Sequence, residues 1–183
     1  ALGHRRLAII DLSEHANQPL IDQQLGLALV FNGTIYNFPQ LRSELQDKGY
    51  HFFSSGDSEV IVKAYAEWGE ACVERLHGMF AFAIWDMRKH SLFLGRDRMG
   101  IKPLYYSFNG KRLRFASTPQ DLLATREIDT PINPLRLPRH LTLHAVLPAP
   151  HTLLNARQKL LPAHSLSFSP VDTISVPAYL TLS

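Results

Sequence analysis

Short apolar runs and helical spacings alternate along the first 120 residues. Residues 25–31 are apolar and are closed by Asn32-Gly33, which is typical of a buried strand that ends in a turn. Leu41 and Leu45 share one helical face, with Asn37 as a candidate cap and Gly49 as a stop, so a helix is expected between them.

The next segment predicts a strand, a loop and two helices. Residues 50–53 are aromatic-rich and are expected to form a strand, and residues 54–58 a loop. Apolar residues then recur at helical spacing over 60–68, and a second short helix carries Cys72.

In residues 79–85, Phe80, Phe82 and Ile84 alternate with Ala81, Ala83 and Trp85. Both faces of this period-two pattern are apolar, which indicates a strand covered on both sides. Further strands are expected over 91–95, 104–108 and 113–116, the last two joined by a two-residue hairpin at Asn109-Gly110. Strands linked by hairpins favour an α+β fold with antiparallel sheets over a parallel doubly wound sheet.

Composition narrows the class of protein. The 183 residues are 45% hydrophobic, enough for a sizeable core, and the net charge of +3 is spread along the chain, which argues against nucleic-acid binding. No apolar run reaches the roughly 18 residues that cross a bilayer, so a soluble, cytoplasmic protein without membrane contact is expected. Cys72 is the one cysteine, which excludes disulfides and Cys-rich zinc sites, and no His spacing predicts a metal.

Beyond residue 130 the chain becomes rich in proline and poor in charge. A solvated linker is usually more polar. The expected division is therefore a domain over 1–130, followed over 131–183 by a Pro-rich linker and the start of a second domain.

Two clusters could bind a small polar substrate. Arg6 offers a planar donor fork for a carboxylate, although it could equally lie on a solvated edge strand. Asn32 and Gly33 could supply a side-chain amide and a backbone N–H to an oxyanion, although such a pair is often just a turn.

Three other features have competing structural interpretations. Asp57, between a strand and a helix, is either a helix cap or a carboxylate for an ammonium group, and its loop only weakly matches an ATP pyrophosphate loop. Residues 95–102 hint at a Walker loop, but Ile101 stands where lysine is required. Cys72 is expected to be a core residue rather than a nucleophile.

Taken in order, the clusters resemble the glutaminase domain of class II glutamine amidotransferases, in the branch of glutamine-hydrolysing asparagine synthetases. The matching strings are GHRRLAIIDLS at 3–13, QP at 18–19, FNGTIYN at 31–37, GDSEV at 56–60, HGMFAFAIWD at 77–86 and GRDRMGIKPLYY at 95–106. The segment LTLHAVLPAP at 141–150 is similar to the subgroup that amidates N-acetylglutaminylglutamine.

The resemblance implies an N-terminal-nucleophile hydrolase fold, an αββα sandwich of antiparallel sheets, here incomplete at the N-terminus. It implies that an N-terminal cysteine attacks glutamine and that ammonia passes to an ATP-dependent synthetase domain. The roles it implies are the α-carboxylate contact for Arg6, the ammonium contact for Asp57 and the oxyanion hole for Asn32 and Gly33. Ile9, Ile10 and Thr34 would line the same pocket.

Two departures from the family pattern shape the expected function. The family's Met-Cys-Gly-Ile start is absent from this chain, and Thr34 replaces a glutamate in the family's Asn-Gly-Glu-Ile-Tyr-Asn string. A truncated amidotransferase domain is therefore expected, one that binds glutamine weakly or not at all and lacks glutaminase activity. No cofactor is expected in this chain, since ATP and Mg²⁺ would serve only the missing synthetase domain.

The missing segment would leave an unpaired sheet edge and exposed apolar surface. A second copy of the chain or a partner chain could cover that surface. The alternative is a non-catalytic module that senses glutamine or binds a partner.

Overall fold

The computed structural model describes residues 1–4, 17–123, 158–169 and 174–180. The chain divides into two compact units, one of residues 1–102 with 163–183 and one of residues 103–162. Each unit holds one antiparallel sheet.

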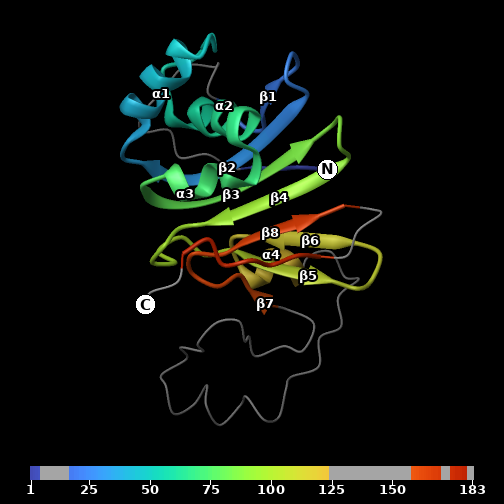
Figure 1. Cartoon of the computed structure of the whole chain (residues 1–183). Helices are drawn as coiled ribbons and strands as arrows, with labels where there is room; N and C mark the ends of the chain where they lie inside the picture. The colour runs from blue at the N-terminus through green and yellow to red at the C-terminus, as the bar shows by residue number, and fades with distance from the viewer. Residues whose placement is uncertain (5–16, 124–157, 170–173, 181–183) are drawn as a thin grey trace. The chain divides into compact units, whose positions relative to one another are not determined.

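The sheet of the first unit has five strands in the order β1-β2-β3-β4-β8 (Figure 1). They are β1 (Leu20–Asp22), β2 (Leu27–Ile35), β3 (Gly78–Asp86), β4 (Ser91–Arg96) and β8 (Ser165–Phe168). The two nine-residue strands β2 and β3 pair along their whole length at the centre of the sheet. Residues 80–84 of β3 are all buried, which confirms the strand predicted to be covered on both faces.

Three helices belong to the same unit, and α1 and α2 lie over one face of the sheet (Figure 1). They are α1 (Phe38–Asp47), α2 (Asp57–Trp68) and α3 (Cys72–Arg75), the last preceded by a 3₁₀ turn at Gly69–Ala71. Odd-numbered apolar residues of β2 pack with these helices in one hydrophobic core. The predicted helices are thereby confirmed. The turn expected at Asn32-Gly33 is wrong, because β2 continues through both residues to Ile35 in register with β3.

The strand expected over residues 50–53 is absent, because these residues are irregular in the structure. The side chains of Tyr50 and Phe52 pack against the core, and the Arg42 guanidinium lies 4.2 Å from the centre of the Phe52 ring. The N–H of Phe53 bonds to a side chain, Glu59, at 3.0 Å. The aromatic residues that suggested a strand thus pack against the core without joining a ladder.

The second unit contains a smaller sheet in the order β6-β5-β7. Its elements are β5 (Tyr105–Phe108), β6 (Leu113–Ala116), α4 (Pro119–Leu123) and β7 (Gln158–Lys159). The hairpin between β5 and β6 is confirmed, but four residues link the strands, where two were expected. The Asn109 Oδ1 accepts the N–H groups of Lys111 at 3.2 Å and Arg112 at 2.8 Å, which closes this longer turn.

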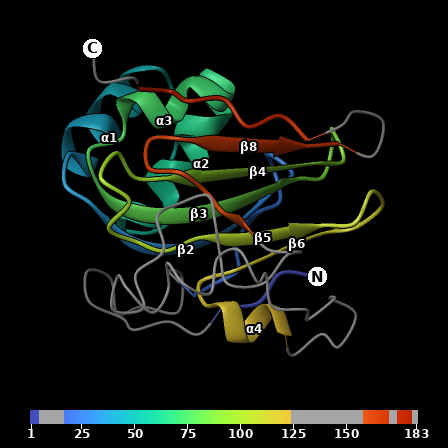
Figure 2. The same cartoon turned by 90° about the horizontal axis from the view of Figure 1, so that it is seen from below.

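Strands from the Pro-rich stretch pair with strands from the first 130 residues in both sheets. β7 pairs with β5, and β8 lies beside β4 at the edge of the five-stranded sheet (Figure 2). Leu160 and Leu166 are buried, so the described part of this stretch contributes apolar side chains to the packed interior. The expected boundary at residue 130 itself lies outside the described residues.

Candidate functional site

The candidate site is built on the outer edge of β2, and the hydrogen bonds of the neighbouring strand establish its geometry. Gly33 is opposite Phe80 on β3. The backbone groups of Phe80 point away from β2, because its carbonyl accepts the Asp97 N–H at 2.8 Å and its N–H donates to Asp97 Oδ2 at 3.2 Å. In an antiparallel ladder the N–H and C=O of one residue point to the same side. The backbone groups of Gly33 therefore point away from β3, to the outer edge of β2.

Every second residue of β2 presents its N–H at this edge, and four of them have identified neighbours, the first being Leu27, which is opposite Asp22 of β1. Leu29 is opposite Leu20 of β1. The Phe31 N–H donates to the Gln18 side-chain oxygen at 2.6 Å, while the Gln18 amide donates to the Phe31 carbonyl at 2.9 Å. The Ile35 N–H donates to Asp57 Oδ2 at 3.0 Å. Among the described residues none bonds to the Gly33 N–H, so a backbone donor lies between a side-chain amide and a carboxylate.

Only glycine fits at residue 33. Its φ is +149°, and a Cβ atom there would lie 2.1 Å from the Met79 carbonyl oxygen and 2.7 Å from the Phe80 Cα. Gly78 on the facing strand repeats the arrangement, with φ of +159° and a Cβ position 2.1 Å from the Thr34 oxygen. The two backbones thus approach each other closely at the point where the donor lies.

Asn32 and Thr34 flank this donor on the face of the sheet opposite the helices. Successive side chains of a strand alternate between faces, and the neighbours Phe31 and Ile35 belong to the helix-side core. Both Asn32 and Thr34 are partly exposed, and among the described residues neither side chain has a hydrogen-bond partner. The Asn32 amide therefore remains available as a second donor beside the Gly33 N–H.

Asp57 brings a carboxylate to the same edge, from the first residue of α2. It is 5% exposed, and its bond to the Ile35 N–H attaches the start of the helix to the end of β2. The N-cap position belongs to Gly56, and no side chain caps the helix, so the interpretation of Asp57 as the cap is wrong. A carboxylate at the first turn of a helix is favoured by the partial positive charge there.

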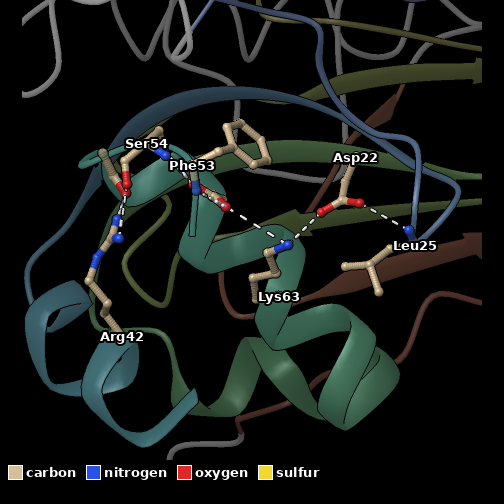
Figure 3. A network of polar contacts seen from close by, with 8 residues as sticks. Asp22, Leu25, Arg42, Phe53, Ser54 and Lys63 are labelled. Atoms are coloured by element: carbon tan, nitrogen blue, oxygen red, sulfur yellow. Dashed lines mark hydrogen bonds and ion pairs between the residues drawn. The ribbon is translucent and has the colours of Figure 1, made fainter. Parts of the chain in front are cut away.

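A buried ionic cluster lies next to the loop of residues 53 and 54 (Figure 3). Lys63 of α2 contacts Asp22 at 2.6 Å and Glu59 at 3.8 Å, and all three side chains are at most 7% exposed. Burial alone would raise the pKa of Asp22, but the bonds from Lys63 and from the Leu25 N–H outweigh it and the pKa is lowered. Sequence reasoning missed this cluster because its members are separated by up to 41 residues.

Residues 95–102 do not form a phosphate-binding loop. The Asp97 carboxylate is fully buried and accepts the N–H groups of Phe80, Met99, Ile101 and Lys102 at 2.9–3.2 Å. Arg96 is 2% exposed and donates through Nε to the Lys102 carbonyl at 2.8 Å. The loop amides that a phosphate would need are occupied by an internal carboxylate.

Cys72 lies in the core, as expected. Its side chain is fully buried, and burial raises the pKa of its thiol far above the ordinary value. We expect native Cys72 to react with a thiol reagent such as Ellman's reagent at least about 100-fold more slowly than the denatured chain does. Equal rates in native and denatured protein would contradict this placement.

Arg6, Ile9 and Ile10 lie outside the described residues. Within the described ranges no three His, Cys, Asp or Glu side chains come together as a metal site. The helices of those same ranges are all too short or too polar to cross a membrane.

Comparisons with known proteins identify the family of this chain. A model of the glutamine amidotransferase domain family matches residues 1–179. Asparagine synthetase (glutamine-hydrolyzing) 3 of Bacillus subtilis is 36% identical over 169 residues, covering 91% of this chain and 27% of that protein. Amidase chry2 of Gibberella zeae is 39% identical over 123 residues, covering 67% of this chain and 18% of that protein. The chain thus spans about a quarter or less of the length of these curated relatives.

The solved structure of glutamine phosphoribosylpyrophosphate amidotransferase from B. subtilis matches with a TM-score of 0.65 at 20% identity. The match covers 98% of this chain and 34% of that one. The likeness confirms the expected α+β fold with antiparallel sheets, of the type found in N-terminal-nucleophile amidotransferases.

Proposed function

Because this chain belongs to the glutamine amidotransferase domain family, we propose that it binds glutamine at the outer edge of β2. One observation carries the proposal: the N–H of Gly33 points to that edge, two residues from the N–H that Asp57 accepts. The edge therefore pairs a donor for an amide oxygen with a carboxylate for an ammonium group, which match two of the three polar groups of glutamine.

The spacing along the strand suits glutamine. Residues 33 and 35 are separated by about 7 Å in an extended strand, comparable with the span from the carboxamide to the α-amine of glutamine. The carboxamide oxygen would accept the Gly33 N–H and the Asn32 amide, and the α-ammonium would approach Asp57. Thr34 carries no charge, so among the described residues of this strand end Asp57 supplies the carboxylate.

The internal pair of Gln18 with Phe31 supports this arrangement. There a glutamine-type carboxamide already bonds to both backbone groups of one residue on the same edge, at 2.6 and 2.9 Å. The backbone of Gly33 is presented in the same direction two residues later, so this edge accommodates a second carboxamide. Arg6 would contact the α-carboxylate, with Ile9 and Ile10 beside it.

We further propose that the 183-residue chain binds glutamine without hydrolysing it. Covalent hydrolysis needs a thiolate next to the carboxamide, and the one cysteine of the sequence, Cys72, is fully buried in the core. Within a longer protein of the asparagine synthetase type, ammonia from this site would amidate an acid. ATP and Mg²⁺ would be needed there by another part of that protein.

Replacing Asp57 with asparagine tests the site. The new amide side chain keeps an oxygen for the Ile35 N–H but loses the charge that faces the ammonium group, so we expect glutamine affinity to fall at least tenfold, about 1.5–3 kcal/mol. Isothermal titration calorimetry with L-glutamine measures the loss, and a coupled ammonia assay run in parallel is expected to show no release.

The matched control is Asp47→Asn, which removes a carboxylate from the exposed end of α1. It is expected to leave affinity unchanged. No glutamine binding by the unaltered chain, or equal affinity in Asp57→Asn and Asp47→Asn, would count against the proposed site. Ammonia release by the unaltered chain would contradict the proposal of binding without hydrolysis.

A further inference from the structure

The loop that leads into Asp57 is held from two sides by side chains of opposite charge. Arg42 of α1 donates through its two terminal nitrogens to the carbonyls of Ser54 at 2.9 Å and Gly56 at 2.8 Å (Figure 3). Glu59 of α2 accepts the Ser54 N–H and the Ser54 hydroxyl, both at 2.7 Å. The Arg42 cation thus donates hydrogen bonds to the loop carbonyls, while the Glu59 carboxylate accepts hydrogen bonds from the loop.

Both side chains are themselves fixed in place. The Arg42 guanidinium lies 4.2 Å from the centre of the Phe52 ring, which limits its rotation. Glu59 is fully buried and lies 3.8 Å from Lys63, whose second partner is Asp22 at 2.6 Å. The loop is therefore attached to α1, to α2 and, through Asp22, to β1.

The residue that follows this clamped loop is Asp57. Gly56 is the N-cap residue of α2, and its backbone is extended, with ψ of 166°. The peptide group that begins with its carbonyl leads directly into the first turn of the helix. Arg42 holds that same carbonyl, directly before the Asp57 N–H. The position of the Asp57 carboxylate relative to the Ile35 N–H thus depends on where Arg42 places Gly56.

From this geometry we infer that Arg42 and Glu59 are positioning residues of the glutamine site, which set the Asp57 carboxylate against the substrate's α-ammonium group. The inference rests on the proposed function. Neither side chain contacts the substrate, and both act through the backbone of residues 53–56. Their contribution therefore falls on the ammonium end of glutamine and leaves recognition of the carboxamide at Gly33 unchanged.

Arg42→Lys is the sharpest test. Lysine keeps the charge but ends in a single ammonium nitrogen, so it cannot bond to two separate carbonyls through the planar fork of arginine. The control is Arg75→Lys: the Arg75 side chain also stacks on an aromatic ring, Trp68 at 4.0 Å, and pairs with a carboxylate, Glu44 at 2.7 Å, but these partners lie outside the loop of residues 53–56.

Two ligands separate positioning from general damage. L-Glutamine carries the α-ammonium group, and glutaramic acid is the same molecule without it. We expect Arg42→Lys to weaken glutamine binding about tenfold while the affinity for glutaramic acid changes less than about twofold. Arg75→Lys should change neither. Equal weakening for both ligands, or unchanged glutamine binding, would overturn the inference.

Amide hydrogen exchange of the ligand-free chain gives a second, independent measurement. Arg42→Lys is expected to increase exchange at Ile35 and Ser54, whose N–H groups bond to Asp57 and Glu59, while the midpoint of thermal unfolding stays close to that of Arg75→Lys. Unchanged exchange at Ile35 would overturn the positioning role. If instead the unaltered chain shows no preference for glutamine over glutaramic acid, the ammonium contact in the proposed function fails, and the exchange data still decide whether Arg42 orders the loop.

Discussion

Replacing Gly33 with alanine is expected to lower the free energy of unfolding by about 3–5 kcal/mol and to abolish glutamine binding. The added Cβ would lie 2.1 Å from the Met79 carbonyl oxygen, so β2 and β3 would have to separate at the residue that presents the donor. The φ of +149° adds strain that a side chain cannot relieve. Urea unfolding measures the first loss and calorimetry with glutamine the second.

Gly49→Ala is the matched control, because it separates backbone strain from the clash. Gly49 also has positive φ, +91°, but no atom lies within 4 Å of its Cβ position. The free energy of unfolding of this variant should fall by only about 1 kcal/mol, and the variant should bind glutamine normally. A Gly33→Ala protein as stable as Gly49→Ala would show that the two strands are not in close contact at this point.

Replacing Lys63 with methionine is expected to cost about 3–5 kcal/mol of stability. Methionine fills a similar volume, but Asp22 and Glu59 would be left buried as like charges without the cation between them. Both carboxylates are at most 5% exposed, so water cannot compensate for the loss. Chemical unfolding followed by the fluorescence of Trp68 and Trp85 gives the difference.

The pH dependence of stability provides a second signature of the same pair. The pKa of Asp22 is lowered in the folded chain, so its ionised form contributes stability above the unfolded pKa of about 3.9 and loses it as pH falls through the folded value. In Lys63→Met that acid-dependent contribution should shrink. Lys48→Met removes an exposed pair with Glu67 at 2.8 Å and should cost less than about 1 kcal/mol. Equal losses in the two variants would show that burial of the Lys63 pair is not important.

The elements that follow strong periodic patterns were predicted well. The both-face apolar run became β3, and the helical spacing over 60–68 became α2, because burying these residues requires those conformations. The strand prediction for residues 50–53 was wrong because Tyr50 and Phe52 pack against the core from an irregular backbone, in which the Phe53 N–H bonds to the Glu59 side chain. No local pattern distinguishes such a segment from a short strand.

The sequence likewise identified some residues of the candidate site and missed others. The types of its residues were readable from Asn32-Gly33 and from Asp57, each beside a predicted strand or helix end. Gln18, Arg42, Glu59 and Lys63 were given no role, although all four hold the site or its loop. Gln18, Arg42 and Lys63 have partners 12 to 41 residues away, and Glu59 bonds to a loop five and six residues before it. Side-chain-to-backbone bonds of this kind follow no spacing rule.

By itself the sequence determined the chemical groups of this protein: a glycine with an amide beside it, and a carboxylate between a loop and a helix. Only the tertiary structure decided that Gly33 lies where a side chain cannot fit, that its N–H is directed to the outer edge of β2, and that Asp57 reaches the same edge two residues further on. The reason is physical. Residue types and periodicity record which groups are buried, whereas the direction of each backbone donor depends on the register between β2 and β3, which residues distant in the chain establish together.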